Sequence, residues 1–366
     1  MERWRSNPEH PAGKTAVVSL TPAGAALAER LAGAWRGERV VDLFSPKGSL
    51  AELVRSIWDG YDGLVFIMAV GIVVRVIAPL LRSKWSDPGV VVVDEKGSFA
   101  VSLAGGHWGM ANSLARQVAA ALGATPVVTT ATDVQGKPAI DLLARECGFR
   151  PLPLERVKAV NMAFLAGERV VIYTEWDLEG ITGGRDFEIF PWAGEPDHPE
   201  ASDCVPVFVT SRVLDSLPEK GLCLCPACLV AGIGCRRGVS GSEIVEAVES
   251  ALRLAGRRRE SLRLLASHTV KEDERGLRDA ASSLRLKTAF FDSGVLQGVM
   301  ENNPGLHDSV FVKSQVGVGG VCETAALVAA TEGRLILPKT RFGRVTVALA
   351  EDGLLWSASG PAIRRI

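Results

Sequence analysis

The sequence lacks an excess of charge of either sign and lacks a long uninterrupted apolar run. Its 41 lysines and arginines nearly balance 42 acidic residues, so the 366-residue chain has a net charge of −1. No global field therefore favours nucleic acid or an anionic membrane. The longest apolar run, residues 63–81, is interrupted by Arg75 and Pro79, which suits a buried strand followed by a helix better than a membrane span. Residues 1–14 lack the apolar segment of a signal peptide, and we expect a cytoplasmic protein.

The seven cysteines lack the arrangement of a disulfide framework or of a complete zinc site. Their odd number and scattered positions agree with reduced thiols. Cys225 and Cys228 have the spacing of a metal-binding pair, and Cys223 and Cys235 lie nearby, but no second such pair completes a tetrahedral set. Packing of small apolar thiols explains the cluster more simply. We expect no metal site in the protein itself.

Apolar strands alternate with amphipathic helices along most of the chain. The alternation begins at residue 15 and resumes near residue 228, after a proline-punctuated stretch that has no long helical pattern. Such alternation predicts an α/β fold with mostly parallel sheets covered by helices. The predicted parts are an N-terminal α/β domain at residues 1–149, a small strand-rich middle module at residues 150–227 and a C-terminal α/β domain at residues 228–366.

Individual elements follow from local patterns. Capping-box spacings that mark expected helix starts are Ser49 with Glu52, Ser240 with Glu243 and Thr269 with Glu272. Expected strands beyond residue 150 are residues 170–173, 187–190, 205–209, 228–234, 262–266, 289–291, 310–312, 335–337 and 345–349. The last helix is expected at residues 322–330.

A glycine-rich turn between an expected strand and an expected helix is the strongest candidate site. Gly105 and Gly106 end a short apolar strand, and apolar residues recur with helical spacing from Ala111. Glycines let backbone approach a ligand closely, and free N–H groups at a helix start favour an anion. The unperturbed pKa of a histidine lies near neutrality, which makes His107 a candidate for proton transfer. The alternative of a capping or core histidine stays open.

Polar loops next to other strands extend this candidate site. They lie around Gly71, Lys84, Gly105 and Thr129. Ligands of open α/β sheets bind at the carboxyl ends of strands. We therefore expect these four loops to line one crevice.

The C-terminal domain offers a second set of candidates. Arg236 and Arg237 lie between a strand end and a capped helix, where guanidinium groups can clamp carboxylates or phosphates; a solvated basic turn is the alternative. Glu323 lies in the first turn of the last expected helix among apolar neighbours, which favours a shifted pKa, although a carboxylate there also suits the helix dipole. Neither a Walker loop nor a GxSxG nucleophile elbow is present.

Taken together, several stretches resemble the CbiG family, and they occur in the family's order over nearly the whole chain. They are residues 66–75 with 77–79, Lys84, residues 87–88 with 91–95, residues 105–107 with Gly109 and 111–112, residues 129–133, residues 232–238, and Gly317 with Val321 and residues 323–327. The resemblance implies a cobalt-precorrin-5A hydrolase of anaerobic cobalamin biosynthesis. In that reaction water opens a δ-lactone of a cobalt corrinoid and acetaldehyde leaves, giving cobalt-precorrin-5B.

The resemblance also implies roles and partners. The cobalt belongs to the substrate, and no organic cofactor is needed. We assign proton transfer to His107 and Glu323. The expected substrate-binding residues are Gly71, Arg75, Lys84, Gly105, Gly106, Asn112, Thr130, Asp133, Arg236 and Arg237. A ligand of this size should lie between two domains, and a homodimer and transient contacts with neighbouring pathway enzymes stay open.

Two alternatives remain at this point. One is a non-catalytic carrier that shields a corrinoid intermediate. The other is a nucleotide-binding enzyme that uses the glycine-rich turns for phosphate. We expect both to be less favoured than hydrolysis.

Overall fold

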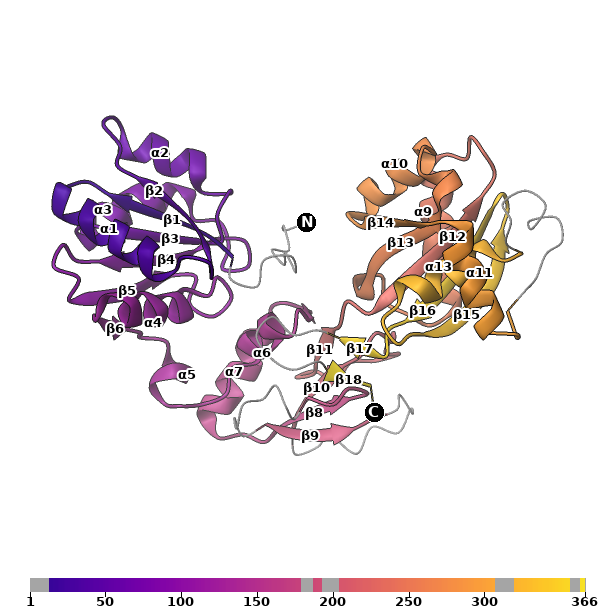
Figure 1. The fold of residues 1–366 in the computed structure, drawn as a ribbon. Helices are drawn as coiled ribbons and strands as arrows, with labels where there is room; N and C mark the ends of the chain where they lie inside the picture. Colours follow the sequence, from indigo (N-terminus) through magenta and orange to yellow (C-terminus); the bar gives the residue numbers. More distant parts are fainter. Residues whose placement is uncertain (1–12, 179–186, 193–203, 307–318, 356–362, 366) are drawn as a thin grey trace. The chain divides into compact units, whose positions relative to one another are not determined.

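The computed structural model describes residues 13–178, 187–192, 204–306, 319–355 and 363–365, and the chain forms two compact units (Figure 1). The N-terminal unit comprises Met1–Arg145 with Phe164–Gly167, and the C-terminal unit comprises Glu146–Ala163 with Glu168–Ile366. Among the described helices, none combines the length and the apolar character needed to cross a lipid bilayer.

The N-terminal unit is built on one six-stranded sheet with the order β2-β1-β3-β4-β5-β6. Its strands are β1 (Lys14–Ser19), β2 (Val40–Phe44), β3 (Gly63–Ile67), β4 (Gly89–Val93), β5 (Phe99–Ala104) and β6 (Thr125–Val127). Neighbouring strands are parallel except β4 and β5, which are joined by a tight turn at Gly97. The ends of β5 and β6 therefore lie at the edge of the sheet where β4 begins.

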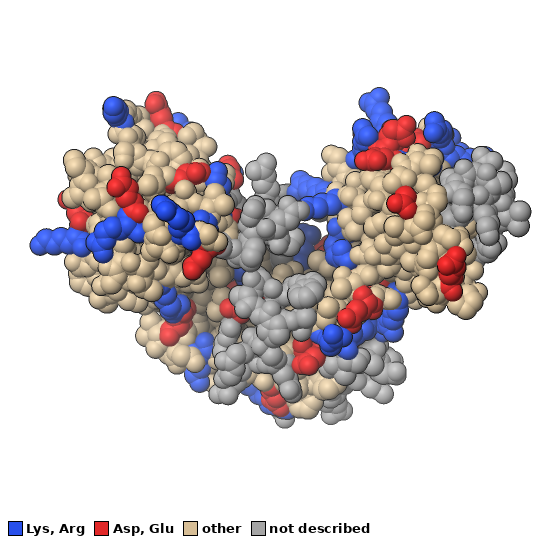
Figure 2. Space-filling view, in the orientation of Figure 1, with Lys and Arg blue, Asp and Glu red and all other residues tan. Residues whose placement is uncertain are grey.

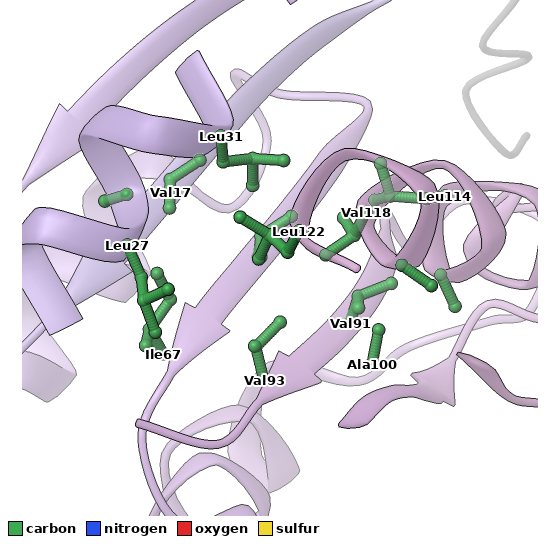
Figure 3. Packing of buried hydrophobic residues seen from close by; sticks show 14 of the residues in the cluster. Val17, Leu27, Leu31, Ile67, Val91, Val93, Ala100, Leu114, Val118 and Leu122 are labelled. Carbon is green, nitrogen blue, oxygen red and sulfur yellow. The ribbon is translucent and has the colours of Figure 1, made fainter. Parts of the chain in front are cut away.

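Helices cover both faces of this sheet. On one face lie α1 (Pro22–Ala34) and α4 (Ala111–Leu122), whose Leu27, Leu31 and Val118 pack on strand residues such as Val17 (Figure 3). On the other face lie α2 (Leu50–Ile57) and α3 (Val70–Ile77). Burying each of these large aliphatic side chains contributes roughly 1.5–3 kcal/mol, so the two clusters fix the three-layer arrangement.

The first sheet of the C-terminal unit has the order β7-β11-β10-β8-β9. The strands are β7 (Arg150–Leu152), β8 (Val170–Thr174), β9 (Glu188–Pro191), β10 (Val205–Val209) and β11 (Leu222–Cys225). The three strands predicted before residue 210 are thus confirmed. The prediction that this stretch contains no long helix was wrong, because α7 (Arg156–Ala166) follows β7. Val157, Val160 and Phe164 are buried at helical spacing there, a pattern masked in the sequence by the prolines around it.

The second sheet of the C-terminal unit has the order β14-β13-β12-β16-β15. Its strands are β12 (Leu229–Cys235), β13 (Leu262–His268), β14 (Lys287–Phe291), β15 (Arg334–Phe342) and β16 (Val345–Glu351). The pair α9 (Gly241–Leu254) and α10 (Arg275–Leu284) packs together, while α11 (Ser293–Asn302) and α13 (Val321–Ala329) share a buried cluster with β12 and β13. The predicted α/β fold with mostly parallel sheets is confirmed. Shorter elements are α5 (Ala131–Val134), α6 (Ile140–Glu146), β17 (Leu354–Leu355) and β18 (Ile363–Arg364).

The three capping predictions have different outcomes. Ser49 Oγ accepts a bond from the Glu52 amide, and Ser240 with Glu243 forms the full reciprocal box at the start of α9. The spacing at Thr269 does not cap a helix. There His268 Nδ1 accepts from the Val270 amide at 3.0 Å and stabilises a short 3₁₀ turn, and α10 begins at Arg275. The strand expected at residues 310–312 lies outside the described residues.

Charges of both signs are mixed on one face of the N-terminal unit. On the face that Figure 2 shows, Lys and Arg side chains are interspersed there with Asp and Glu. Over its described residues, this face therefore has no large patch of one sign, in agreement with the balanced composition.

Candidate functional site

His107 is held between two carboxylates in the turn that joins β5 to α4. Its Nε2 lies 2.6 Å from Asp133 Oδ2, and its Nδ1 lies 3.0 Å from Asp141 Oδ1. The residue is 9% exposed. Because a carboxylate accepts hydrogen bonds and an imidazole donates through both nitrogens only when it is protonated, this geometry selects the imidazolium form.

The pKa values of the pair follow from this arrangement. Burial lowers the pKa of His107, but the hydrogen bonds to Asp133 and Asp141 outweigh burial and raise that pKa to about 9. Burial raises the pKa of Asp133, but hydrogen bonds from His107 and Arg116 outweigh it and lower that pKa to about 2. At neutral pH the pair is therefore an imidazolium beside a carboxylate. In this state His107 can act as an acid and not as a base.

An amide network fixes the partner of the histidine. Asn112 Nδ2 donates to Thr130 Oγ1 and to Asp133 Oδ2, both at 2.9 Å. Ser102 Oγ donates to Asn112 Oδ1 at 2.7 Å. Hydrogen bonds thus link four of the predicted site residues, which are His107, Asn112, Thr130 and Asp133. These residues come from the turn, from α4 and from the start and body of α5.

The glycines of the turn serve the protein's own backbone. Gly105 has φ +77°, and a Cβ there would lie 2.8 Å from the Pro88 carbonyl oxygen. A Cβ at Gly89 would lie 2.3 Å from the Gly109 carbonyl oxygen. The sequence predicted that a ligand approaches the backbone of these glycines closely. In the structure, the chain at the start of β4 takes that place. A Cβ at Gly106 would meet its nearest neighbour at 3.4 Å, so this position is less tightly packed.

Beside this turn lies an edge-to-face pair of tryptophans that sequence reasoning missed. The rings of Trp85 and Trp108 are 4.8 Å apart and nearly perpendicular. Lys84 Nζ lies 4.4 Å from the centre of the Trp85 ring, and Arg145 Cζ lies 6.0 Å from that of Trp108. Such cation–π contacts hold the two positive charges beside the rings. The predicted residue Lys84 is therefore an exposed cation close in the fold to the histidine turn.

Two predicted residues lie elsewhere on the sheet. Gly71 and Arg75 are exposed on α3, which starts at the carboxyl end of β3. Because β5 runs antiparallel to β4, the histidine turn lies at the opposite edge from the start of α3. The prediction that the loops around Gly71 and Gly105 line one crevice was wrong.

Asp141, the second carboxylate on the histidine, was also missed. It lies 34 residues beyond His107, in the first turn of α6. No local spacing marks this contact in the sequence. An acidic residue at the start of a helix is ordinary, so only the fold reveals its role.

In the C-terminal unit, Glu323 borders a pocket of about 570 Å³. Glu323 is 2% exposed, and its Oε1 accepts a bond of 2.9 Å from the backbone N–H of Lys339. Lys339 and Arg341 also line this pocket. The predicted Arg236 and Arg237 are exposed in the loop after β12 and are not among the described residues that line it.

The cysteine cluster lies in and just after β11. Cys223, Cys225 and Cys228 are buried, and the sulfurs of Cys223 and Cys225 are 3.6 Å apart. Over the described ranges, no group of three or more His, Cys, Asp or Glu side chains is arranged to hold a metal ion.

Three family models match consecutive parts of the chain. The model described as "Cobalamin synthesis G N-terminal" matches residues 52–133. "Cobalamin biosynthesis central region" matches residues 138–226, and "Cobalamin synthesis G C-terminus" matches residues 229–350.

Individual relatives are similar over nearly their whole length. The cobalt-precorrin-5A hydrolase of Priestia megaterium is 32% identical, with 96% of this chain and 98% of the relative covered. The protein of that name from Salmonella typhimurium is 36% identical, with 91% and 96% covered. A solved cobalamin biosynthesis protein G homologue from Sulfolobus solfataricus is 25% identical, with 93% and 97% covered and a TM-score of 0.38. From its amino-terminal to its carboxyl-terminal segment, this chain belongs to the CbiG family of cobalamin biosynthesis proteins.

Proposed function

We propose that this chain is a cobalt-precorrin-5A hydrolase. The support is the similarity, over more than nine-tenths of the chain, to two relatives that carry this name. The reaction that the family resemblance implies is the opening of a δ-lactone by water, followed by loss of acetaldehyde. The observation that carries our assignment of the site is the imidazole of His107 held between Asp133 and Asp141.

The chemistry needs a proton donor as well as a base. Negative charge develops on oxygen when water attacks the lactone carbonyl, and a nearby cationic acid stabilises it. His107 supplies such an acid because its pKa is raised to about 9. The side chains of Asp133 and His107 are 13% and 6% exposed. Because both imidazole nitrogens are bonded to carboxylates, one of these bonds must open before His107 donates a proton to substrate. The base that activates water is then a separate group.

Lys84 is our first choice for holding an acid side chain of the substrate near this pair. It is exposed, and the aromatic contact with Trp85 restricts its ammonium group. A restricted cation loses less conformational entropy when it binds a carboxylate. Arg75, on α3, stays a substrate-binding prediction without this support, as do Arg236 and Arg237.

The test is acetaldehyde release from cobalt-precorrin-5A. We expect His107→Ala and Asp133→Asn each to lower kcat by about 100-fold or more, the range of a lost acid catalyst. Asp42→Asn, which alters an exposed ion pair with Lys14, is the control and retains activity. Full activity of a folded His107→Ala variant would remove this residue from the chemistry. Wild-type protein that retains one corrinoid per chain and releases no acetaldehyde would indicate a carrier instead.

Three further predictions are part of this proposal. They are the need for no organic cofactor, the cytoplasmic location, and a homodimer or transient contact with neighbouring enzymes. Glu323 was predicted to transfer protons. Its hydrogen bond to the backbone amide of Lys339 instead favours a role in positioning that residue.

A further inference from the structure

The pocket beside Glu323 depends on an irregularity in the β15–β16 hairpin. Leu337 pairs with Leu349 and Thr340 pairs with Val347. Between these two pairs β15 contains one residue more than β16, which makes a β-bulge. Such a bulge leaves a residue outside the ladder of hydrogen bonds and turns nearby side chains. The interval contains Pro338, which has no N–H to donate.

In the bulge, the carboxylate of Glu323 accepts the hydrogen bond of a backbone N–H. The Lys339 N–H donates to Glu323 Oε1 at 2.9 Å. The carboxylate is 2% exposed and comes from the first turn of α13. A buried amide without a partner costs about 1–3 kcal/mol, so Glu323 fixes the bulge and the position of Lys339.

The bulge places two cations at one pocket. Lys339 and Arg341 both line it, and Arg341 lies opposite Thr346, a further lining residue. Arg341 Nε donates to the Gly343 carbonyl oxygen at 2.9 Å, which orients the guanidinium. Within the described part of the chain, neither cation forms an ion pair with an acidic side chain. Among the described residues that line the pocket, two cations outnumber one carboxylate, and this balance favours an anion.

We propose that this pocket binds an acid side chain of the tetrapyrrole substrate through Lys339 and Arg341, and that Glu323 is a positioning residue for Lys339. This inference rests on the proposed function, because a polycarboxylated corrinoid supplies the anion. A guanidinium binds a carboxylate through two parallel hydrogen bonds, in a bidentate manner, and an ammonium adds a compact point charge. The volume of about 570 Å³ lies in the range of small-molecule sites.

The first test uses a binding probe that needs no turnover. Uroporphyrin I, an octacarboxylic tetrapyrrole, is titrated against the full-length protein and followed by its absorbance. We expect Lys339→Ala and Arg341→Ala each to raise the Kd by about tenfold, which corresponds to loss of one charge-assisted contact. Arg275→Ala is the matched control, because Arg275 is an exposed arginine of α10 whose partner is Asp279. Its Kd stays at the wild-type value.

The second test separates positioning from proton transfer at Glu323. Glu323→Gln keeps an oxygen that can accept the Lys339 N–H, whereas Glu323→Ala removes it. We expect Glu323→Gln to retain kcat for acetaldehyde release within about threefold, and Glu323→Ala to raise KM and the uroporphyrin Kd by about tenfold. Circular dichroism verifies that each variant is folded.

Distinct outcomes overturn distinct parts. Unchanged Kd and KM in Lys339→Ala and Arg341→Ala overturn the binding pocket. A collapse of kcat in Glu323→Gln at unchanged Kd overturns the positioning role and returns Glu323 to proton transfer. If wild-type protein releases no acetaldehyde while the two cation variants still weaken uroporphyrin binding, the proposed function fails and the pocket stands.

Discussion

The charge of His107 comes from its neighbours. An isolated buried imidazole loses its proton easily, because burial disfavours the charged form. Here Asp133 and Asp141 reverse that tendency and raise its pKa from 6.5 to about 9. The same contacts that prepare His107 as an acid therefore also stabilise the fold, so its protonation is linked to the free energy of unfolding.

The pH dependence of stability tests this linkage. Because the folded-state pKa of His107 lies above the unfolded value, its stabilisation is fully present below about pH 6.5 and is lost as the pH rises through about 9. We expect the wild-type free energy of unfolding to fall across this window relative to that of His107→Gln. Urea unfolding at pH 6, 7.5 and 9 measures the difference. Parallel profiles for the two proteins would contradict the raised pKa.

Asp141 gives a second prediction at the residue scale. Asp141→Asn keeps the shape of the side chain but removes one of the two carboxylate charges beside the imidazole. We therefore expect the pKa of His107 to fall. The expected loss of stability is about 1–3 kcal/mol. The high-pH limb of the kcat profile should move to lower pH, which a purely structural role would not produce. NMR titration of the His107 ring measures the pKa directly, and an unchanged value would count against the contact.

At the scale of elements, the direction of one strand decides where the site lies. The strand before Gly105 and the helix from Ala111 are visible in the sequence. Their consequence for the sheet is a long-range pairing, since β5 joins β4 antiparallel. Periodicity predicts which residues are buried and not which edge a loop reaches. For this reason the elements were predicted well and the grouping of Gly71 with Gly105 was not.

The packing of the histidine turn predicts a large effect at Gly105. Gly105→Ala adds a Cβ that meets a backbone oxygen at 2.8 Å, at a φ of +77°. Gly123→Ala is the control, because Gly123 has φ +71° and nothing within 4 Å of an added Cβ. We expect about 1 kcal/mol of destabilisation in the control, from the backbone conformation alone. Gly105→Ala should lose clearly more; equal losses in thermal unfolding would mean that the turn relaxes freely.

At the scale of the molecule, buried charges join the two sheets of the C-terminal unit. Glu351, at the end of β16, is 1% exposed and accepts a hydrogen bond of 2.6 Å from Ser211, which follows β10. Arg365 pairs with Glu351 and also with Glu175, which follows β8. No local spacing predicts these contacts, because Ser211 and Glu351 are 140 residues apart. A composition with balanced charge cannot reveal which charges are buried.

This network predicts a strong effect of one neutral substitution. Glu351→Gln leaves the buried Arg257 and the half-buried Arg365 beside an uncharged amide. Removing one partner of a buried ion pair typically costs about 3–5 kcal/mol. The matched control is Glu332→Gln, whose ion pair with Arg364 has side chains 54% and 65% exposed and contributes about 0–1 kcal/mol. Urea unfolding of both variants, followed by tryptophan fluorescence, measures the two losses. Because Trp176 lies against the Arg365 guanidinium, its emission should also change in Glu351→Gln. Equal, small losses in the two variants would show that each sheet is stable without the charges between them.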